Sequence, residues 1–253
     1  IVTNIRQRRA KFGMGGDGGC FGLLQCKRVL LDHCSGAWSA DENFGAFRVE
    51  DVTFQWCISA EGLRRSGHIE GDHSCGIIVH RAHRVTLHHS LFVSNVHRNP
   101  YWKGNYGMPW GGASPPADLE TGLDENGVRV FGHFDIRNNL FYNYGSQAGH
   151  TGFPSRTNFV GNVYRPGPSS PKDGKPVAVA GAYEQFGYAQ IYAKDNLGPG
   201  RTGDDEDQYA LFSGSGANFR VTRPIPAPSV ESQPARNAVE VILDEADRRG
   251  VAR

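Results

Sequence analysis

The sequence predicts a right-handed parallel β-helix, an all-β solenoid, on the strength of three observations. Seven short apolar segments of similar form recur along the 253-residue chain, and each meets a small polar residue at one register. The 33 glycines and 14 prolines suit many short turns better than long helices. A repeat of about 20–50 residues with one short strand per unit is typical of solenoids. One coil cannot bury its own apolar face, so coils stack and share a core.

The shared polar position predicts a ladder that runs along the inside of the solenoid. Its spacings are 30, 23, 33, 49, 23 and 34 residues, so a unit near 23 carries an insertion in several coils. A small polar side chain repeated on neighbouring coils can hydrogen-bond to its own copy. The positions are Asn4, Cys34, Cys57, Ser90, Asn139, Asn162 and Asn196.

Two of these ladder positions are cysteines, Cys34 and Cys57, on neighbouring predicted coils. Stacked strands lie about 4.8 Å apart, which is within the Cα range of a disulfide. Two buried thiols that fill the ladder are favoured over a disulfide, and both alternatives stay open. The five cysteines form an odd set without a CxxC pair, so they do not identify a compartment.

The chain divides into strand units, loops and a helical tail. Strand units fill residues 1–100, and glycine, proline and aromatic residues at 101–127 predict a long loop. The remaining stretches are predicted as repeats at 128–164, a loop at 165–174, strands near Val177 and at 189–197, a polar Gly-rich stretch at 198–216, and extended chain at 223–234.

A C-terminal helix is predicted from Ala238, Val241, Ile242 and Ala246, which fall on one helical face, with Gly250 as its stop. We expect this amphipathic helix to cover the side or the open end of the solenoid. Coils and loops over 1–222 and the extended segment and helix over 223–253 then make one domain, 1–253.

Composition narrows the classes of partner. A formal net charge of +1 gives no overall field that would attract nucleic acid or a membrane surface. No apolar run approaches the roughly 18 residues needed to span a bilayer. Ile1 opens directly inside a strand pattern without a signal-peptide pattern before it. Because a solenoid that starts mid-coil would expose an apolar end, we expect further coils upstream.

Several blocks of the sequence carry a family resemblance. They are LDHCSGAWSADEN (31–43), DVTFQWCISAEGLRRSGH (51–68), VTLHHSLFVSN (85–95) and HRNP (97–100), with weaker echoes in FDIRNNLFYNYG (134–145) and YAKDN (192–196). In these blocks the chain resembles the pectate lyase family, the first of the polysaccharide lyase families. The resemblance implies calcium-dependent β-elimination on pectate (polygalacturonate) or a related polyuronate. It also implies a secreted, extracellular or periplasmic monomer.

The resemblance implies which acidic residues hold calcium. Asp17 matches a family calcium aspartate upstream of the LLDH strand, and Asp41 and Glu42 match the second acidic cluster. Calcium prefers hard oxygen ligands, so carboxylates must converge at one point. Adjacent residues of a strand face opposite sides. Asp41 and Glu42 can therefore act together only if they lie in a turn; otherwise they form a solvated turn.

Arg98 matches the arginine to which the family assigns removal of the C5 proton. Free arginine is protonated at all ordinary pH values, so a salt bridge or a clamp on a substrate carboxylate is the alternative role. The predicted substrate-binding residues are Arg64, Arg65, His68, Trp102 and Lys103. Relatives often read HPKGEHSYG where this chain has HIEGDHSCG, so Glu70 replaces a lysine that would neutralise substrate.

Three alternatives accompany this interpretation. A glycoside hydrolase on the same solenoid would need a carboxylate pair across the scissile bond, and the spacing identifies none. A lyase relative that only binds polysaccharide is consistent with Glu70. Histidines cluster near the same coils, but no HExxH-like spacing indicates zinc, and His89 aligns with His33 and Trp56 as a stacked wall position.

Overall fold

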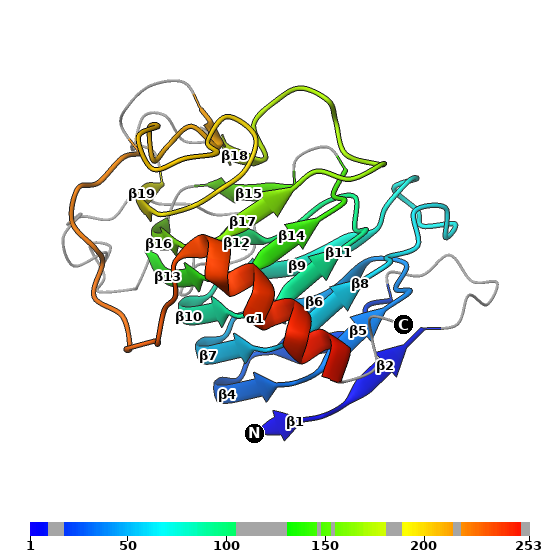
Figure 1. Cartoon of the computed structure of the whole chain (residues 1–253). Coiled ribbons are helices and arrows are strands. Elements are labelled where there is room, and N and C mark those ends of the chain that lie inside the picture. Colours follow the sequence, from blue (N-terminus) through cyan, green and yellow to red (C-terminus); the bar gives the residue numbers. More distant parts are fainter. Residues whose placement is uncertain are drawn as a thin grey trace.

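The predicted parallel β-helix is confirmed in a computed structural model, which describes residues 1–9, 18–104, 131–145, 148–152, 155–180, 189–214 and 219–248. Within these ranges every strand pairing in the three sheets is parallel. Sheet A has the order β1-β4-β7-β10-β13-β16-β19, sheet B β17-β14-β11-β8-β5-β2, and sheet C β20-β18-β15-β12-β9-β6-β3. Figure 1 shows the coils stacked in chain order from β1 at one end towards β19 at the other.

The strands are short, as one face of a coil requires. Sheet A contains β1 (Val2–Thr3), β4 (Lys27–Asp32), β7 (Glu50–Gln55), β10 (His83–His88), β13 (Gly132–Arg137), β16 (Ser155–Val160) and β19 (Gln190–Lys194). Sheet B contains β2 (Arg6–Arg8), β5 (Ser35–Ala37), β8 (Ile58–Ala60), β11 (Leu91–Val93), β14 (Leu140–Tyr142) and β17 (Val163–Arg165). Sheet C contains β3 (Phe21–Leu24), β6 (Glu42–Phe47), β9 (Cys75–His80), β12 (Tyr101–Lys103), β15 (Gly149–Gly152), β18 (Val177–Ala180) and β20 (Phe212–Ser213).

The core is built from side chains that stack on equivalent residues of the next coil. In sheet A, Val85 pairs in register with Val52 on one side and with Phe134 on the other, and all three are buried. Aromatic rings continue this stack from sheet B: Phe141 lies 5.0 Å from Phe92 and 4.4 Å from Tyr164 between ring centroids. Each coil thus covers the apolar surface that the neighbouring coil would otherwise expose to solvent.

The corner between sheets A and B uses a single residue in the left-handed region. Its φ is 54° at His33, 53° at Trp56 and 50° at His89, and Gly161 adopts 64° in the same role. The three rings stack, with centroids 6.1 Å apart for His33–Trp56 and 4.6 Å apart for Trp56–His89. The predicted stacked wall position of His89 is therefore confirmed.

The polar ladder follows this corner and is confirmed at six positions: Cys34, Cys57, Ser90, Asn139, Asn162 and Asn196. Asn139 donates through Nδ2 to Asn162 Oδ1 at 3.0 Å, and Asn162 donates to Asn196 Oδ1 at 3.1 Å. The prediction was wrong for Asn4. Thr3 pairs with Asp32, so Asn4 occupies the corner beside His33, and Ile5 lies at the ladder register.

The two ladder cysteines are not joined by a disulfide. Cys34 and Cys57 are buried, and neither forms a disulfide. The Cys34 thiol donates to the Val2 carbonyl at 3.6 Å, and the Cys57 thiol donates to the Leu31 carbonyl at 3.6 Å. Backbone carbonyls of the preceding coil thus accept from the thiols, as the alternative of two buried thiols predicts.

The C-terminal helix α1 (Ala235–Arg248) covers the side of the solenoid, along sheet B (Figure 1). Its buried face packs on one apolar residue from each of four coils: Ile58, Leu91, Leu140 and Val163. Ala238, Ile242 and Ala246 point inward as predicted, but Val241 is 38% exposed and Val239 is buried instead. Gly250 lies outside the described residues. No helix among the described residues is long and apolar enough to cross a membrane.

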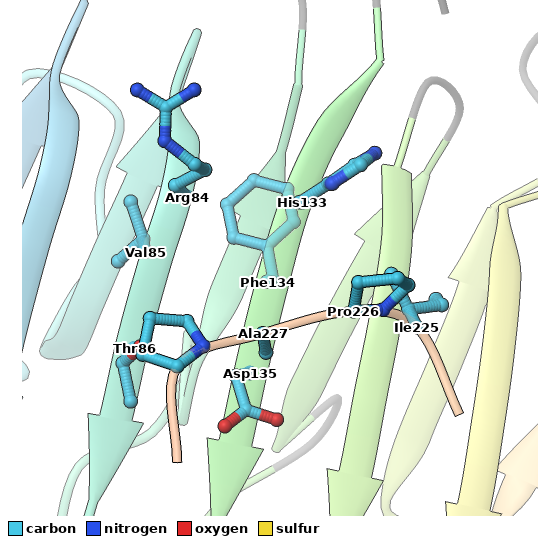
Figure 2. Close-up of a pocket in the computed structure, with 10 residues that line it drawn as sticks. Arg84, Val85, Thr86, His133, Phe134, Asp135, Ile225, Pro226 and Ala227 are labelled. Carbon is cyan, nitrogen blue, oxygen red and sulfur yellow. The ribbon is translucent and has the colours of Figure 1, made fainter. Parts of the chain in front are cut away.

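The segment before α1 is extended, as the sequence predicts, and it crosses the outer face of sheet A (Figure 2). Asn158 donates through Nδ2 to the Ile225 carbonyl at 2.8 Å and accepts from the Ile225 N–H at 2.8 Å. Asn138 bonds in the same reciprocal way to the Gln233 backbone. Two asparagines on separate coils therefore hold the segment in place.

We expect Asn162→Ala to destabilise the fold strongly. Asn162 is fully buried, accepts from Asn139 and donates to Asn196 and to the Ile136 carbonyl. Removing it leaves buried donors and acceptors unpaired, so we expect a loss of about 3 kcal/mol in the free energy of unfolding. Urea unfolding measures this loss. Asn237→Ala, on the exposed face of α1, is the matched control, and an equal loss in both variants would contradict the ladder's role.

We expect stability to fall as the pH drops from about 6.5 to about 4. Burial lowers the pKa of His88 to about 4, with a smaller contribution from His89. Between the unfolded and folded pKa values, the unfolded chain binds a proton that the folded chain does not, so acid favours unfolding. Unfolding curves at several pH values measure the slope. A His88→Gln variant should show a shallower slope, and an unchanged one would contradict this assignment.

Candidate functional site

Two acidic residues and one arginine meet at the edge of sheet C where β6, β9 and β12 begin. Asp41 precedes β6 in a bend and Glu42 is its first residue, so the two carboxylates converge instead of facing opposite sides. Arg98 Nη1 lies 3.5 Å from Asp41 Oδ1 and forms a second, shorter ion pair with Glu42 Oε1. The Cys75 thiol completes the cluster. The side-chain ligand atoms of Asp41, Glu42 and Cys75 all lie within 4.8 Å of one another.

Main-chain pairing brings these segments together. The Cys75 N–H donates to the Asp41 carbonyl at 3.1 Å, and the Ile77 N–H donates to the Arg98 carbonyl at 2.8 Å. β9 therefore lies between the acidic segment and the arginine segment and is bonded to both. Residues 57 positions apart in the sequence reach one point because they lie at the same corner of two coils that are separated by a single coil.

A second set of stacked asparagines, the corner network of Asn43, Asn95 and Asn99, fixes the same segments from inside. Asn43 donates to Asn95 Oδ1 at 3.1 Å, and Asn95 donates to Asn99 Oδ1 at 3.3 Å. All three side chains are buried. Asn43 follows Glu42 and Asn99 follows Arg98, so the network positions the two ion-pairing residues. All three asparagines lie within the motifs that carry the family resemblance, but the sequence pattern does not indicate that their side chains bond to one another.

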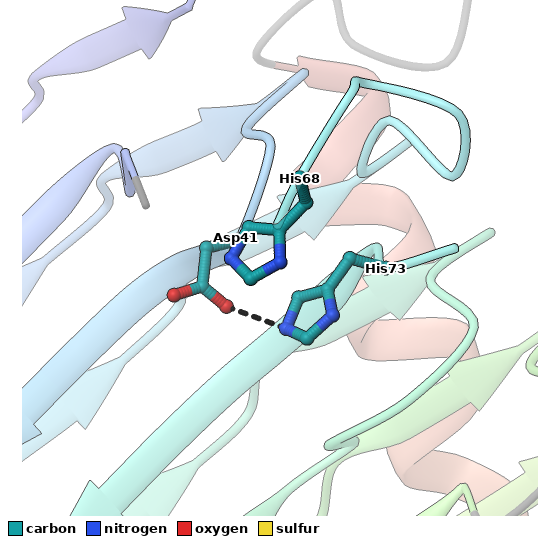
Figure 3. Close-up of side chains that lie close together, drawn as sticks. All are labelled: Asp41, His68 and His73. Carbon is teal, nitrogen blue, oxygen red and sulfur yellow. Dashed lines mark ion pairs between the residues drawn. The ribbon is translucent and has the colours of Figure 1, made fainter. Parts of the chain in front are cut away.

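Two histidines flank Asp41 on its other side (Figure 3). His73 Nε2 lies 2.9 Å from Asp41 Oδ1, and the rings of His68 and His73 stack at 3.9 Å between centroids. Both histidines are buried, with 8% and 7% of their surface exposed, and both belong to the segment between β8 and β9. Ligand atoms of Asp41, His68 and His73 lie within 4.8 Å of one another.

A depression of about 250 Å³ opens beside Arg98 and is lined by His73, Cys75, His97, Arg98, Tyr101 and His150. Its surroundings are positive. Burial lowers the pKa of His150, and the charges of Arg98 and Lys103 lower it further. The pKa of Lys103 is lowered by burial and then by Arg81. These cations repel one another along the outer side of sheet C, so this surface favours a polyanion.

The structure brings together some of the predicted site residues and separates others. Asp41, Glu42, Arg98 and His68 form one cluster, whereas Asp17 lies outside the described residues. Lys103 ends β12 on the same sheet. Arg64 and Arg65 are exposed in the segment between β8 and β9, and Arg64 Nε forms an ion pair with Asp72 at 2.9 Å.

The prediction that Trp102 binds substrate was wrong. Residues 101–103 form β12 and are not part of a loop, and Trp102 pairs in register with the buried Val79. Its side chain therefore points into the core, where it is 1% exposed and donates through Nε1 to Thr157 Oγ1 at 2.8 Å. Tyr101, the adjacent residue, points outward and stacks on His150 at 4.7 Å.

A second cavity, between the extended segment and sheet A, is not a substrate site. It is lined by residues of β10 and β13 and by Ile225–Pro228 (Figure 2). Its volume of about 30 Å³ admits at most a few water molecules. It is a packing gap beneath the extended segment.

Comparison with curated proteins finds similarity to fungal pectate lyases. The chain is 33% identical over 142 residues to a probable pectate lyase C of Aspergillus flavus, covering 52% of this chain and 32% of that protein. It is 28% identical over 169 residues to the probable pectate lyase C of Emericella nidulans, covering 66% of this chain and 32% of that protein. The resemblance to pectate lyases is confirmed. The chain spans about a third of the length of these pectate lyases, and no protein-family model matches it.

Solved pectate lyase structures also resemble the chain. One is a pectate lyase from Bacillus sp. N165 in complex with trigalacturonate, with a TM-score of 0.48 and 14% identity over 95% of this chain and 65% of that chain. Another is a thermostable pectate lyase, with a TM-score of 0.47 and 11% identity over 92% of this chain and 65% of that chain.

We expect Arg98→Gln to destabilise the protein because it leaves the carboxylates of Asp41 and Glu42 close together without a cation. The loss should be about 1–2 kcal/mol, below the range for a fully buried pair because the Arg98 side chain is 28% exposed. Urea unfolding measures it. In an Asp41→Asn, Glu42→Gln background the same change should cost much less. Arg64→Gln, which removes an exposed ion pair, is the control.

Proposed function

We propose that this protein is a polysaccharide lyase that cleaves pectate or a related polyuronate by calcium-assisted β-elimination. The observation that carries the proposal is the convergence of Asp41, Glu42 and Arg98 at one edge of sheet C, beside a depression lined with cationic and imidazole groups. The similarity to proteins named pectate lyase supports the same reaction.

Asp41 and Glu42 would hold the calcium ion. Their oxygens already lie close together and face one cation, and carboxylate oxygens are the ligands that calcium prefers. Bound calcium would neutralise the uronate carboxylate and thereby acidify the neighbouring C5 proton. Asp17, the third predicted ligand, stays a prediction.

Arg98 would bind the uronate carboxylate or take the C5 proton. In the observed arrangement two carboxylates form ion pairs with its guanidinium, and a planar guanidinium suits a bidentate clamp on a carboxylate. The proton-accepting role has no comparable support in these contacts. The clamp is the role that the observed contacts favour.

Lys103 and His150 would bind further carboxylates of the polymer. Both have a lowered pKa because burial and neighbouring cations disfavour their charged forms. An anionic chain in the depression would relieve this repulsion, and alternate uronates along the polymer supply anions at intervals. We infer a secreted monomer that acts on acidic polysaccharide, as the resemblance implies.

The structure favours the lyase over a glycoside hydrolase. Asp41 and Glu42 are bound to the same guanidinium, so they do not form an acid and a base on opposite sides of a scissile bond. A relative that binds polysaccharide without cleaving it remains a separate outcome of the test below.

The decisive experiment incubates the protein with polygalacturonate and follows the ultraviolet absorbance of the unsaturated product. We expect absorbance to rise with calcium and to stop when a chelator is added. Arg98→Lys should lower the rate by about 10²–10⁴, because lysine cannot reproduce the planar fork.

Controls separate the alternatives. Arg248→Gln, at the exposed end of α1, should leave the rate unchanged. Reducing ends without a rise in absorbance would indicate a hydrolase, and retention on immobilised polygalacturonate without either product would indicate an inactive binding protein. Either result would overturn the proposed lyase activity.

A further inference from the structure

We propose that Asp41, His68 and His73 form a site for a divalent transition metal of the zinc class, which shares Asp41 with the ligand pair Asp41–Glu42 proposed for calcium but differs from it in its other ligands. Three donor groups lie within 4.8 Å of one another, and two of them are imidazoles. Imidazole nitrogen is a common ligand of zinc and a poor one for calcium, which prefers oxygen. The donor chemistry therefore points to a different metal from the one that Asp41 and Glu42 suit.

The cluster is preassembled. Asp41 comes from the bend before β6, whereas both histidines come from the segment between β8 and β9. The stacked imidazoles are buried, so little side-chain freedom remains to be lost when a metal binds. Figure 3 shows one oxygen of the Asp41 carboxylate directed at the edge of the His73 ring, with the His68 ring stacked beside it.

Glu70 supplies a fourth donor within reach. Its Oε2 lies 3.9 Å from His73 Nε2, the same nitrogen that contacts Asp41 Oδ1 at 2.9 Å. Two carboxylates and two imidazoles match the four ligands of a tetrahedral zinc site. The acidic side chain at position 70 thus gains a function that a lysine could not serve.

Metal binding would require two local changes. The proton between His73 Nε2 and Asp41 Oδ1, which lie 2.9 Å apart, would be released to solvent, because both groups would bind the metal. The second change concerns His68. The Glu70 N–H donates to His68 Nδ1 at 3.1 Å, so a neutral His68 carries its proton on Nε2. A metal on Nε2 would shift that proton to Nδ1 and open the contact with Glu70. The turn that makes this contact, residues 69–72, is exposed, and Gly71 has open space around its Cβ position. The turn can therefore move without disturbing the core.

Asp41 belongs to both metal sites, which has a consequence for the proposed function. A zinc ion held by Asp41 and the histidines would withdraw that carboxylate from calcium. Zinc should therefore weaken calcium binding and inhibit the lyase, an effect that rests on the proposed function. The binding of zinc itself does not depend on any activity.

Isothermal titration of the untagged full chain with zinc chloride tests the site. We expect one bound zinc ion per chain, and an affinity about tenfold lower or worse in His68→Asn and in His73→Asn. His133→Asn, on the opposite sheet A, is the matched control and should bind as the unaltered protein does. Equal affinity in all four proteins, or no binding to the unaltered chain, would overturn the proposal.

Cobalt substitution provides a readout that folding defects do not imitate. Cobalt(II) bound in place of zinc should give the intense visible absorption of a four-coordinate site in the unaltered protein and in His133→Asn. It should be lost in His73→Asn, with circular dichroism verifying that the variant is folded. The same spectrum in a folded His73→Asn would refute the proposed ligand set.

A calcium titration at saturating zinc separates the two proposals. If saturating zinc weakens calcium binding to the unaltered protein but not to His73→Asn, the result supports Asp41 as a ligand shared by the two sites. Zinc binding by a chain that shows no calcium-dependent lyase activity would refute the proposed function and leave the zinc site intact. Calcium-dependent activity without zinc binding would support the proposed function and overturn the zinc site.

Discussion

The stacking of coils in register is the constraint on which the rest of the structure depends, and buried asparagines enforce it. Asn139, Asn162 and Asn196 bond along the corner between sheets A and B, and Asn43, Asn95 and Asn99 bond at the edge of sheet C. A shift of one residue would turn every apolar side chain of a strand outward and leave these amides unpaired. Apolar burial gives the stack its stability, while the amides give it a unique register.

The candidate site is a product of that register. Asp41, Glu42 and Arg98 contribute no apolar surface, and their approach brings two anions and a cation into a part-buried position. Such a group is held only because the segments on either side are fixed by β9 and by the corner network. The site therefore has its geometry before any ligand arrives, which is what efficient charge stabilisation requires.

The sequence predicted the repeat, the ladder and the residues that converge, because each leaves a periodic or motif-level trace. It failed where neighbouring residues differ only in the direction of the side chain. The pattern predicts Asn4 one residue out of register because β1, with two residues, has too few apolar side chains to fix its phase. The glycines that follow Trp102 predict a loop there, yet pairing with Val79 turns its side chain inward. The contacts between histidines and Asp41 join separate coils and have no sequence signature.

The spacing of the ladder shows how such a molecule can diverge. Ser90 and Asn139 are 49 residues apart and Asn139 and Asn162 only 23, yet both pairs stack in the same way. The described strands on either side of the longer connection keep the same register as the others. The length of chain between two coils can therefore vary while the edge that carries Asp41, Glu42 and Arg98 keeps its geometry.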